Sequence, residues 1–150
     1  MGHKFKTKLL QKRAESLTLL KHFKLVAGEV IQQGSNVSFA WPRYCSGWKL
    51  IELISFIDKF KLKLVGFDGS AVGVKSKKGN FMKKPWRIAT TSTQLANNLS
   101  NKRCDRSHQH EERGGNNAAN SAFYPPQLAK LIVDGLTNGH IGARVYSCCC

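Results

Sequence analysis

Acidic residues are scarce in this chain. Its 150 residues include only 9 Asp and Glu against 24 Lys and Arg, which gives a formal net charge of +15. Such a surplus of cations favours a polyanionic partner, because Lys and Arg that neutralise phosphates release the condensed counterions of a nucleic acid. Beyond Arg113 the only basic residues are Lys130 and Arg144. We therefore expect DNA or RNA to bind the part of the chain that precedes residue 113.

Long apolar runs are also absent. No stretch approaches the roughly 20 apolar residues that cross a bilayer, and the N-terminus lacks the apolar segment of a secretory signal. Cysteine occurs five times, an odd number, and three of these residues form the terminal run 148–150. An odd count predicts no disulfide framework and favours a reducing compartment. We expect an intracellular protein, nuclear or cytoplasmic, that has no membrane partner.

The periodicity of apolar residues predicts alternating helices and strands. Steps of three and four residues predict a long helix over 8–33. Further helices are expected at 48–60, 92–100 and 124–136, and strands at 36–40, 62–68 and 86–91. This order predicts an α/β fold, a partial Rossmann-like three-layer sandwich with a short, mostly parallel sheet.

The chain divides into three parts on composition. Residues 1–12 form a basic N-terminal extension, and residues 137–150 a flexible tail. The α/β domain fragment between them, 13–136, includes a polar loop at 101–121 that is rich in Asn and Gly.

Basic and aromatic residues follow the predicted strand ends, which is where ligands bind in parallel α/β sheets. The motifs "AWPRYCSGW" and "DGSAVG" lie there, and "VKSKKGNFMKKPWR" reads as a basic loop or ribbon. Cations bind phosphates and rings stack on bases. The residues that we expect to contact nucleic acid are Trp41, Arg43, Lys83, Lys84, Trp86 and Arg87. The alternative is structural: the tryptophans pack in the core, and Arg43 pairs with Asp68.

A metal site is the second candidate. Cys104, His108 and His110 form a Cys-x3-His-x-His pattern, three zinc-competent ligands within seven residues. A structural zinc needs a fourth ligand, for which Cys45 is a candidate, while Ser70 is a poor one. The alternative is a polar loop with unligated histidines. No other cofactor is expected.

The order of the motifs resembles a known domain. The stretches are "GSNVSFAWPRYCSGWKLIELISFI", "VGFDGSAVGVKSKKG", "KKPWRIATTS", "RCDRSHQHE" and "SAFYPPQLAKLIV". They resemble the C-terminal part of a domain found in retroelement-type polyproteins and uncharacterised reading frames of marine eukaryotes. That domain is in turn distantly similar to the cytosine-5 DNA methyltransferases. The resemblance covers roughly Arg13 to Val133.

Departures from the family pattern bear on catalysis. Ala40 stands where the relatives carry the glutamate that holds the base, and Ser70 stands where they carry a cysteine of the metal cluster. The nucleophilic Pro-Cys loop and the glycine-rich turn for S-adenosylmethionine would lie before Met1. The resemblance thus implies a non-catalytic, nucleic-acid-binding remnant of a mobile-element methyltransferase-like domain, and no enzyme by itself.

Two alternatives stay open at this point. The chain could be the product of a truncated or degenerate reading frame with no selected activity. It could also be one subunit of a split methyltransferase, whose partner would be the missing N-terminal half that binds the cofactor.

Overall fold

The computed structural model describes residues 3–111, 124–137 and 144–147. Part of the predicted polar loop, residues 112–121, and most of the predicted tail lie outside the described residues. The helices are α1 (His3–Gln32), α2 (Ile51–Phe60), α3 (Thr93–Ser100) and α5 (Pro126–Thr137), with short 3-10 helices η1 (Ser46–Lys49) and η2 (Gly69–Val72). The strands are β1 (Val37–Pro42), β2 (Lys63–Asp68), β3 (Pro85–Thr90) and β4 (Arg144–Ser147).

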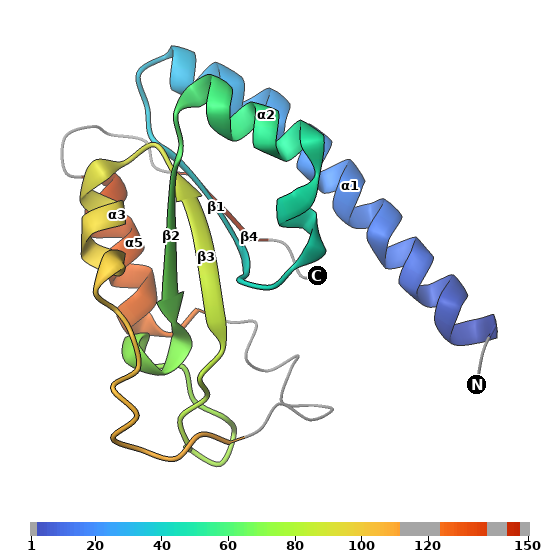
Figure 1. Ribbon diagram of the computed structural model, residues 1–150. Helices are drawn as coiled ribbons and strands as arrows, with labels where there is room; N and C mark the ends of the chain where they lie inside the picture. Colours follow the sequence, from blue (N-terminus) through green and yellow to red (C-terminus); the bar gives the residue numbers. More distant parts are fainter. Residues whose placement is uncertain (1–2, 112–123, 138–143, 148–150) are drawn as a thin grey trace.

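Local chemistry explains several of the helix ends. Ser92 is the N-cap of α3, and its hydroxyl accepts the backbone N–H of Leu95. Lys61 ends α2 in the left-handed conformation, where its N–H donates to the carbonyls of Ile57 and Asp58. Helix α1 runs without a break through the segment 3–12, and its first buried core residue is Leu20. Figure 1 shows the N-terminal half of α1 projecting past the sheet.

The sheet has the order β2-β3-β1-β4, and its strand directions overturn the sequence prediction. Strand β3 pairs antiparallel with both β1 and β2, and only the short β4 adds a parallel pair, along β1. A mostly parallel, Rossmann-like sheet is therefore wrong. The 69–84 connection between β2 and β3 holds no crossover helix, only η2 and a bridge between Lys75 and Phe81. The chain consequently re-enters the sheet at the end that it left, and this forces β3 to run antiparallel.

Helices cover both faces of the sheet (Figure 1). Helices α1 and α2 pack on one face against Phe39 and Trp41, and α3 and α5 pack on the other against Ala40 and Ile88. The alternation of side chains along each strand produces this division. Trp41, Arg87 and Gly66 are register partners across three neighbouring strands, so all three face the α1 and α2 side. This row positions the cationic site described below.

Candidate metal centre and cationic surface

Three metal-ligating side chains come together at the end of the sheet where β2 finishes. The Sγ atom of Cys104 lies 3.1 Å from His110 Nε2 and 3.7 Å from His108 Nε2. In a tetrahedral zinc site, sulfur and nitrogen ligands lie roughly 3.3 to 3.6 Å apart, because each is about 2.0 to 2.3 Å from the ion. All three ligand atoms lie within 4.8 Å of one another, so the cluster could hold a metal ion once the two histidines move closer together.

Ser70 lies beside this cluster, next to His110. Its hydroxyl oxygen lies 3.3 Å from His110 Nε2, and its side chain is buried. Cys45, the fourth ligand that the sequence offered, lies elsewhere: its sulfur accepts the N–H of Gly47 at the start of η1. Among the described residues a hydroxyl, and not a second thiolate, therefore lies next to the three ligands.

The end of β2 holds the metal-ligating loop in place. The N–H of Asp68 donates to the carbonyl of Lys102, and the N–H of Cys104 donates to Asp68 Oδ2 at 3.1 Å. These two bonds fix the backbone on either side of Arg103. Because Ser70 follows Asp68 by two residues, the same strand end delivers the hydroxyl to the cluster.

Short turns direct the donor atoms of the loop inward. The N–H of Arg106, a residue with φ of 63°, donates to the sulfur of Cys104. The N–H and hydroxyl of Ser107 both donate to the carboxylate of Asp105. The backbone N–H of Ser107 is the main reason that the pKa of Asp105 lies below its usual value. The turn thereby keeps an ionised carboxylate next to the cluster.

The basic ribbon, defined here as the segment Lys75–Lys83, packs directly against the metal-ligating loop. Phe81 makes the central contact. Its ring centroid lies 4.4 Å from the ring centroid of His108, and Lys75 Nζ lies 4.8 Å from the ring centroid of Phe81. The carbonyl of Phe81 accepts the N–H of Glu111. The carboxylate of Glu111 in turn accepts from Ser76 Oγ and Asn80 Nδ2. The metal cluster and the ribbon therefore form one local unit.

Cations dominate the surface of the ribbon. Four of its lysines have exposed side chains, namely Lys75, Lys77, Lys78 and Lys83. Within the described residues, the two ion pairs are Arg43 with Asp68 and Lys130 with Asp134, so none of the four lysines has a carboxylate partner. Their charge is directed to solvent.

The burial of Trp41, Trp86 and Lys84 corrects three predicted contacts with nucleic acid. Trp41 is 2% and Trp86 4% exposed, so neither ring offers a free face to a base. Trp41 packs edge-on against Phe39, and η1 approaches its ring so closely that a Cβ on Gly47 would overlap it. Lys84 is 7% exposed, and its ammonium lies over the ring of Trp86. All three residues belong to the packed interior, as the structural alternative anticipated for the tryptophans.

Lys83, Arg43 and Arg87 remain available at the surface, although only Lys83 is fully exposed. Arg43 Nη2 donates to the carbonyl of Phe67 and lies 3.4 Å from Asp68 Oδ1. Arg87 places its guanidinium 5.6 Å from the ring centroid of Trp48. Arg43 therefore makes the predicted pair with Asp68, and within the described residues Arg87 has an aromatic contact but no carboxylate.

Two residues with functional potential were not predicted from the sequence. Tyr44 is 81% exposed at the turn after β1, and Arg103 is exposed between the two backbone bonds that hold the loop to β2. Tyr44 stands in the quoted motif "PRYCSGW", where an exposed turn following a buried strand could have indicated it. Nothing local indicates Arg103, because its position depends on a long-range contact.

Ala40 does not lie at a ligand-facing rim. Its side chain is 2% exposed within the core between the sheet and α3 and α5, opposite Ile88 in the register. A glutamate at this position would have its carboxylate among Leu95 and Leu128, at a high desolvation cost. In this fold alanine is the residue that suits position 40.

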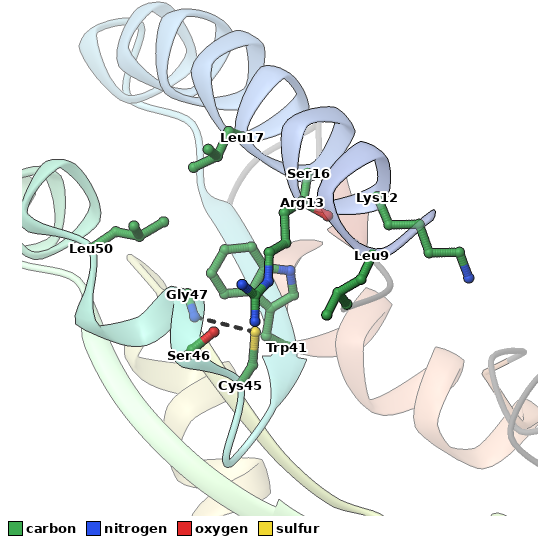
Figure 2. Close-up of a pocket in the computed structure, with 10 residues that line it drawn as sticks. All are labelled: Leu9, Lys12, Arg13, Ser16, Leu17, Trp41, Cys45, Ser46, Gly47 and Leu50. Carbon is green, nitrogen blue, oxygen red and sulfur yellow. Dashed lines mark hydrogen bonds between the residues drawn. The ribbon is translucent and has the colours of Figure 1, made fainter. Parts of the chain in front are cut away.

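A separate groove runs between α1 and the η1 loop. Figure 2 shows Leu9, Leu17 and Leu50 around the edge of Trp41, with Lys12 and Arg13 on α1. The groove encloses about 540 Å³. Its lining is apolar apart from a few groups, so its chemistry suits an apolar segment that also carries acidic side chains.

Comparison with protein-family models, curated proteins and solved structures found no match to this chain. Within the described part of the chain, no helix combines the length and the apolar character that a membrane span requires.

Proposed function

We propose that this chain is a non-catalytic nucleic-acid-binding domain in which a zinc ion holds the basic ribbon. The observation that carries the proposal is the set of exposed lysines on the ribbon, Lys75, Lys77, Lys78 and Lys83, none of which has a carboxylate partner within the described residues. Closely spaced, unneutralised ammonium groups are what a phosphate backbone binds best. The surplus of 24 Lys and Arg over 9 acidic residues supports the same partner.

The zinc ion would be bound by Cys104, His108 and His110, with Ser70 or a water molecule in the fourth position. Zinc supplies a fixed tetrahedral geometry and, in small domains, much of the free energy of folding. Its role here is structural. Because His108 packs on Phe81, a bound ion would restrict the motion of the ribbon and present its lysines in one arrangement.

Binding to a fluorescent oligonucleotide at two salt concentrations tests the proposal. The affinity should fall steeply between 50 and 200 mM salt, by about tenfold or more, since each phosphate contact adds roughly one unit to the slope of log K against log salt. Replacement of Lys75, Lys77 and Lys78 by Gln should flatten this slope by roughly two to three units. Added zinc should raise the affinity of the wild-type chain, and a chelator should reverse that gain.

The matched control replaces three exposed lysines of α1, Lys6, Lys8 and Lys12, by Gln. It removes the same charge at a distance from the ribbon, and so separates a local binding surface from a general effect of net charge. An oligonucleotide affinity that does not change with salt concentration would refute the electrostatic account. An equal loss in the control would show that the ribbon is not the binding surface.

A further inference from the structure

Two guanidinium groups converge over one residue of β2. A Cβ atom built on Gly66 would lie 3.1 Å from Arg43 Nε and 3.2 Å from Arg103 Nη2. Both groups therefore lie over the same point on the face of the sheet, although 60 residues separate them in the sequence. Glycine at position 66 leaves the space in which they meet.

A third arginine flanks this point. Arg87 is the register partner of Gly66 on β3, and its side chain faces the same side of the sheet. The ring of Trp48 supports the Arg87 guanidinium, and Trp48 is itself fixed by a hydrogen bond from its Nε1 to the carbonyl of Pro42 at 3.0 Å. Three separate segments thus bring Arg43, Arg87 and Arg103 to one patch.

The charge on this patch is not balanced. Asp68 pairs with Arg43 at 3.4 Å, and its second oxygen is taken by the N–H of Cys104. Neither Arg87 nor Arg103 forms an ion pair within the described residues. In addition, Arg43 Nε is buried without an acceptor. A buried donor without an acceptor, the unpaired Arg103 beside it and the unpaired Arg87 on the neighbouring strand together favour an anion with several oxygens.

An exposed aromatic side chain belongs to the same turn as Arg43. Tyr44 directly follows Arg43 in the sequence, and its side chain is 81% exposed at the turn after β1. A ring held in solvent at a turn gains nothing from packing, but it can stack on a base. Bases inside a duplex are already stacked, whereas those of a single strand are free to bind a ring.

We propose that Arg43, Arg87 and Arg103 bind a phosphate of a single-stranded nucleic acid over Gly66, and that Tyr44 stacks on a neighbouring base. The inference rests on the proposed function and adds the class of nucleic acid to it. The ribbon lysines attract any phosphate backbone, whereas the arginine site with Tyr44 selects unpaired strands. The arginines supply paired N–H donors that match the oxygens of a phosphate.

Anisotropy titration with a single-stranded oligonucleotide and a duplex of the same length tests this inference. The wild-type chain should bind the single strand more tightly by about tenfold, from the stacking of one base. Tyr44→Ala should remove most of that preference and leave binding to the duplex unchanged, while Tyr44→Phe should retain it. Arg103→Gln should weaken binding of the single strand by several-fold more than Arg13→Gln, a matched change on α1.

Several outcomes separate the inference from the proposed function. If the wild-type chain binds both forms equally and Tyr44→Ala changes neither affinity, the inference fails while the role of the ribbon stands. If the chain binds neither form at low salt, both fail. Competition with inorganic phosphate is the last measurement. Strong displacement of the oligonucleotide by millimolar phosphate would mean that the site binds the free ion, and it would overturn the assignment to a nucleic acid.

Discussion

Asp68 contacts two candidate sites of opposite chemistry, a possible metal cluster and an arginine site. The cluster of Cys104, His108 and His110 gathers groups that can donate electron pairs to a metal ion, whereas the arginine site over Gly66 gathers cations that can bind an anion. One carboxylate serves both, since Asp68 Oδ1 contacts Arg43 and Asp68 Oδ2 accepts the N–H of Cys104. The end of a single strand can therefore organise two binding sites at once, and a change at Asp68 should affect both.

Replacement of Asp68 by Asn should have the largest effect. The carboxylate is 7% exposed and compensates Arg43, so its loss leaves that guanidinium without its counter-charge and weakens the acceptor for Cys104. Removal of one partner of such a pair costs about 2 to 4 kcal/mol. We expect a loss of this size in the free energy of unfolding in urea, together with weaker binding of zinc and of single strands.

Asp134→Asn is the control for this change. It also breaks an ion pair, but that pair with Lys130 is exposed on α5, and exposed pairs contribute about 0 to 1 kcal/mol. Equal losses in the two variants would mean that Asp68 does not couple the two sites.

His110→Ala should break the metal site alone. The imidazole lies between Cys104 and Ser70, and its removal takes away a ligand that faces both. We expect zinc affinity to fall by at least about a hundredfold and zinc to lose its effect on the melting temperature. His22→Ala, at an exposed position of α1, should change neither the affinity for zinc nor the effect of zinc on the melting temperature. Without zinc, His110→Ala and the wild-type chain should bind single strands equally; a large difference would show that the arginine site depends on His110 itself.

The comparison also explains what the sequence could and could not reveal. Cys104, His108 and His110, which the sequence offered as metal ligands, lie together in the structure and could hold a metal, because ligands within seven residues can meet in one loop. Only the resemblance pointed to position 70 beside them, since Ser70 reaches the cluster through the bonds between β2 and the loop. Arg103 was not predicted, because its position depends on the same long-range bonds between the loop and β2.

Helices were easier to predict than strand directions. The apolar periodicity placed α2, α3 and α5 close to their observed positions. The predicted direction of β3 was wrong because the alternation of apolar residues along a strand does not encode its orientation in the sheet. The missing signal was the lack of a helix in the 69–84 connection, which favours antiparallel pairing. Strand β4 lies in the segment that composition assigned to a tail.

Ser70→Cys should have a smaller effect, and this effect should be on the affinity for zinc. A thiol in place of the hydroxyl that lies 3.3 Å from His110 Nε2 would complete a Cys2His2 set. We expect zinc to bind on the order of tenfold more tightly in a competition titration with a chromogenic chelator. Ser70→Ala should weaken binding slightly, and Ser46→Cys, a thiol at an exposed position, should change nothing. Unchanged affinity in Ser70→Cys would place the fourth ligand elsewhere.

Gly66→Ala should have the smallest effect, and it should fall on the arginine site only. The added methyl group would meet the far ends of two flexible side chains, Arg43 and Arg103, at 3.1 to 3.2 Å, so both must shift by a few tenths of an ångström. Stability should stay equal or rise by about 0.5 to 1 kcal/mol, because alanine loses less backbone entropy than glycine in a strand. The single-strand affinity should nevertheless fall by roughly twofold to threefold, since phosphate recognition by paired N–H donors depends on their spacing.

Gly28→Ala supplies the matched comparison for this change. A Cβ at this position of α1 would make an ordinary contact with Phe60 at 3.7 Å, so the gain in stability should come with no loss of binding. The two variants thus differ in whether the methyl group touches guanidinium groups. If Gly66→Ala bound single strands as tightly as Gly28→Ala while zinc affinity stayed the same in both, the two arginines would not need their position over β2, and Asp68 would organise only the metal site.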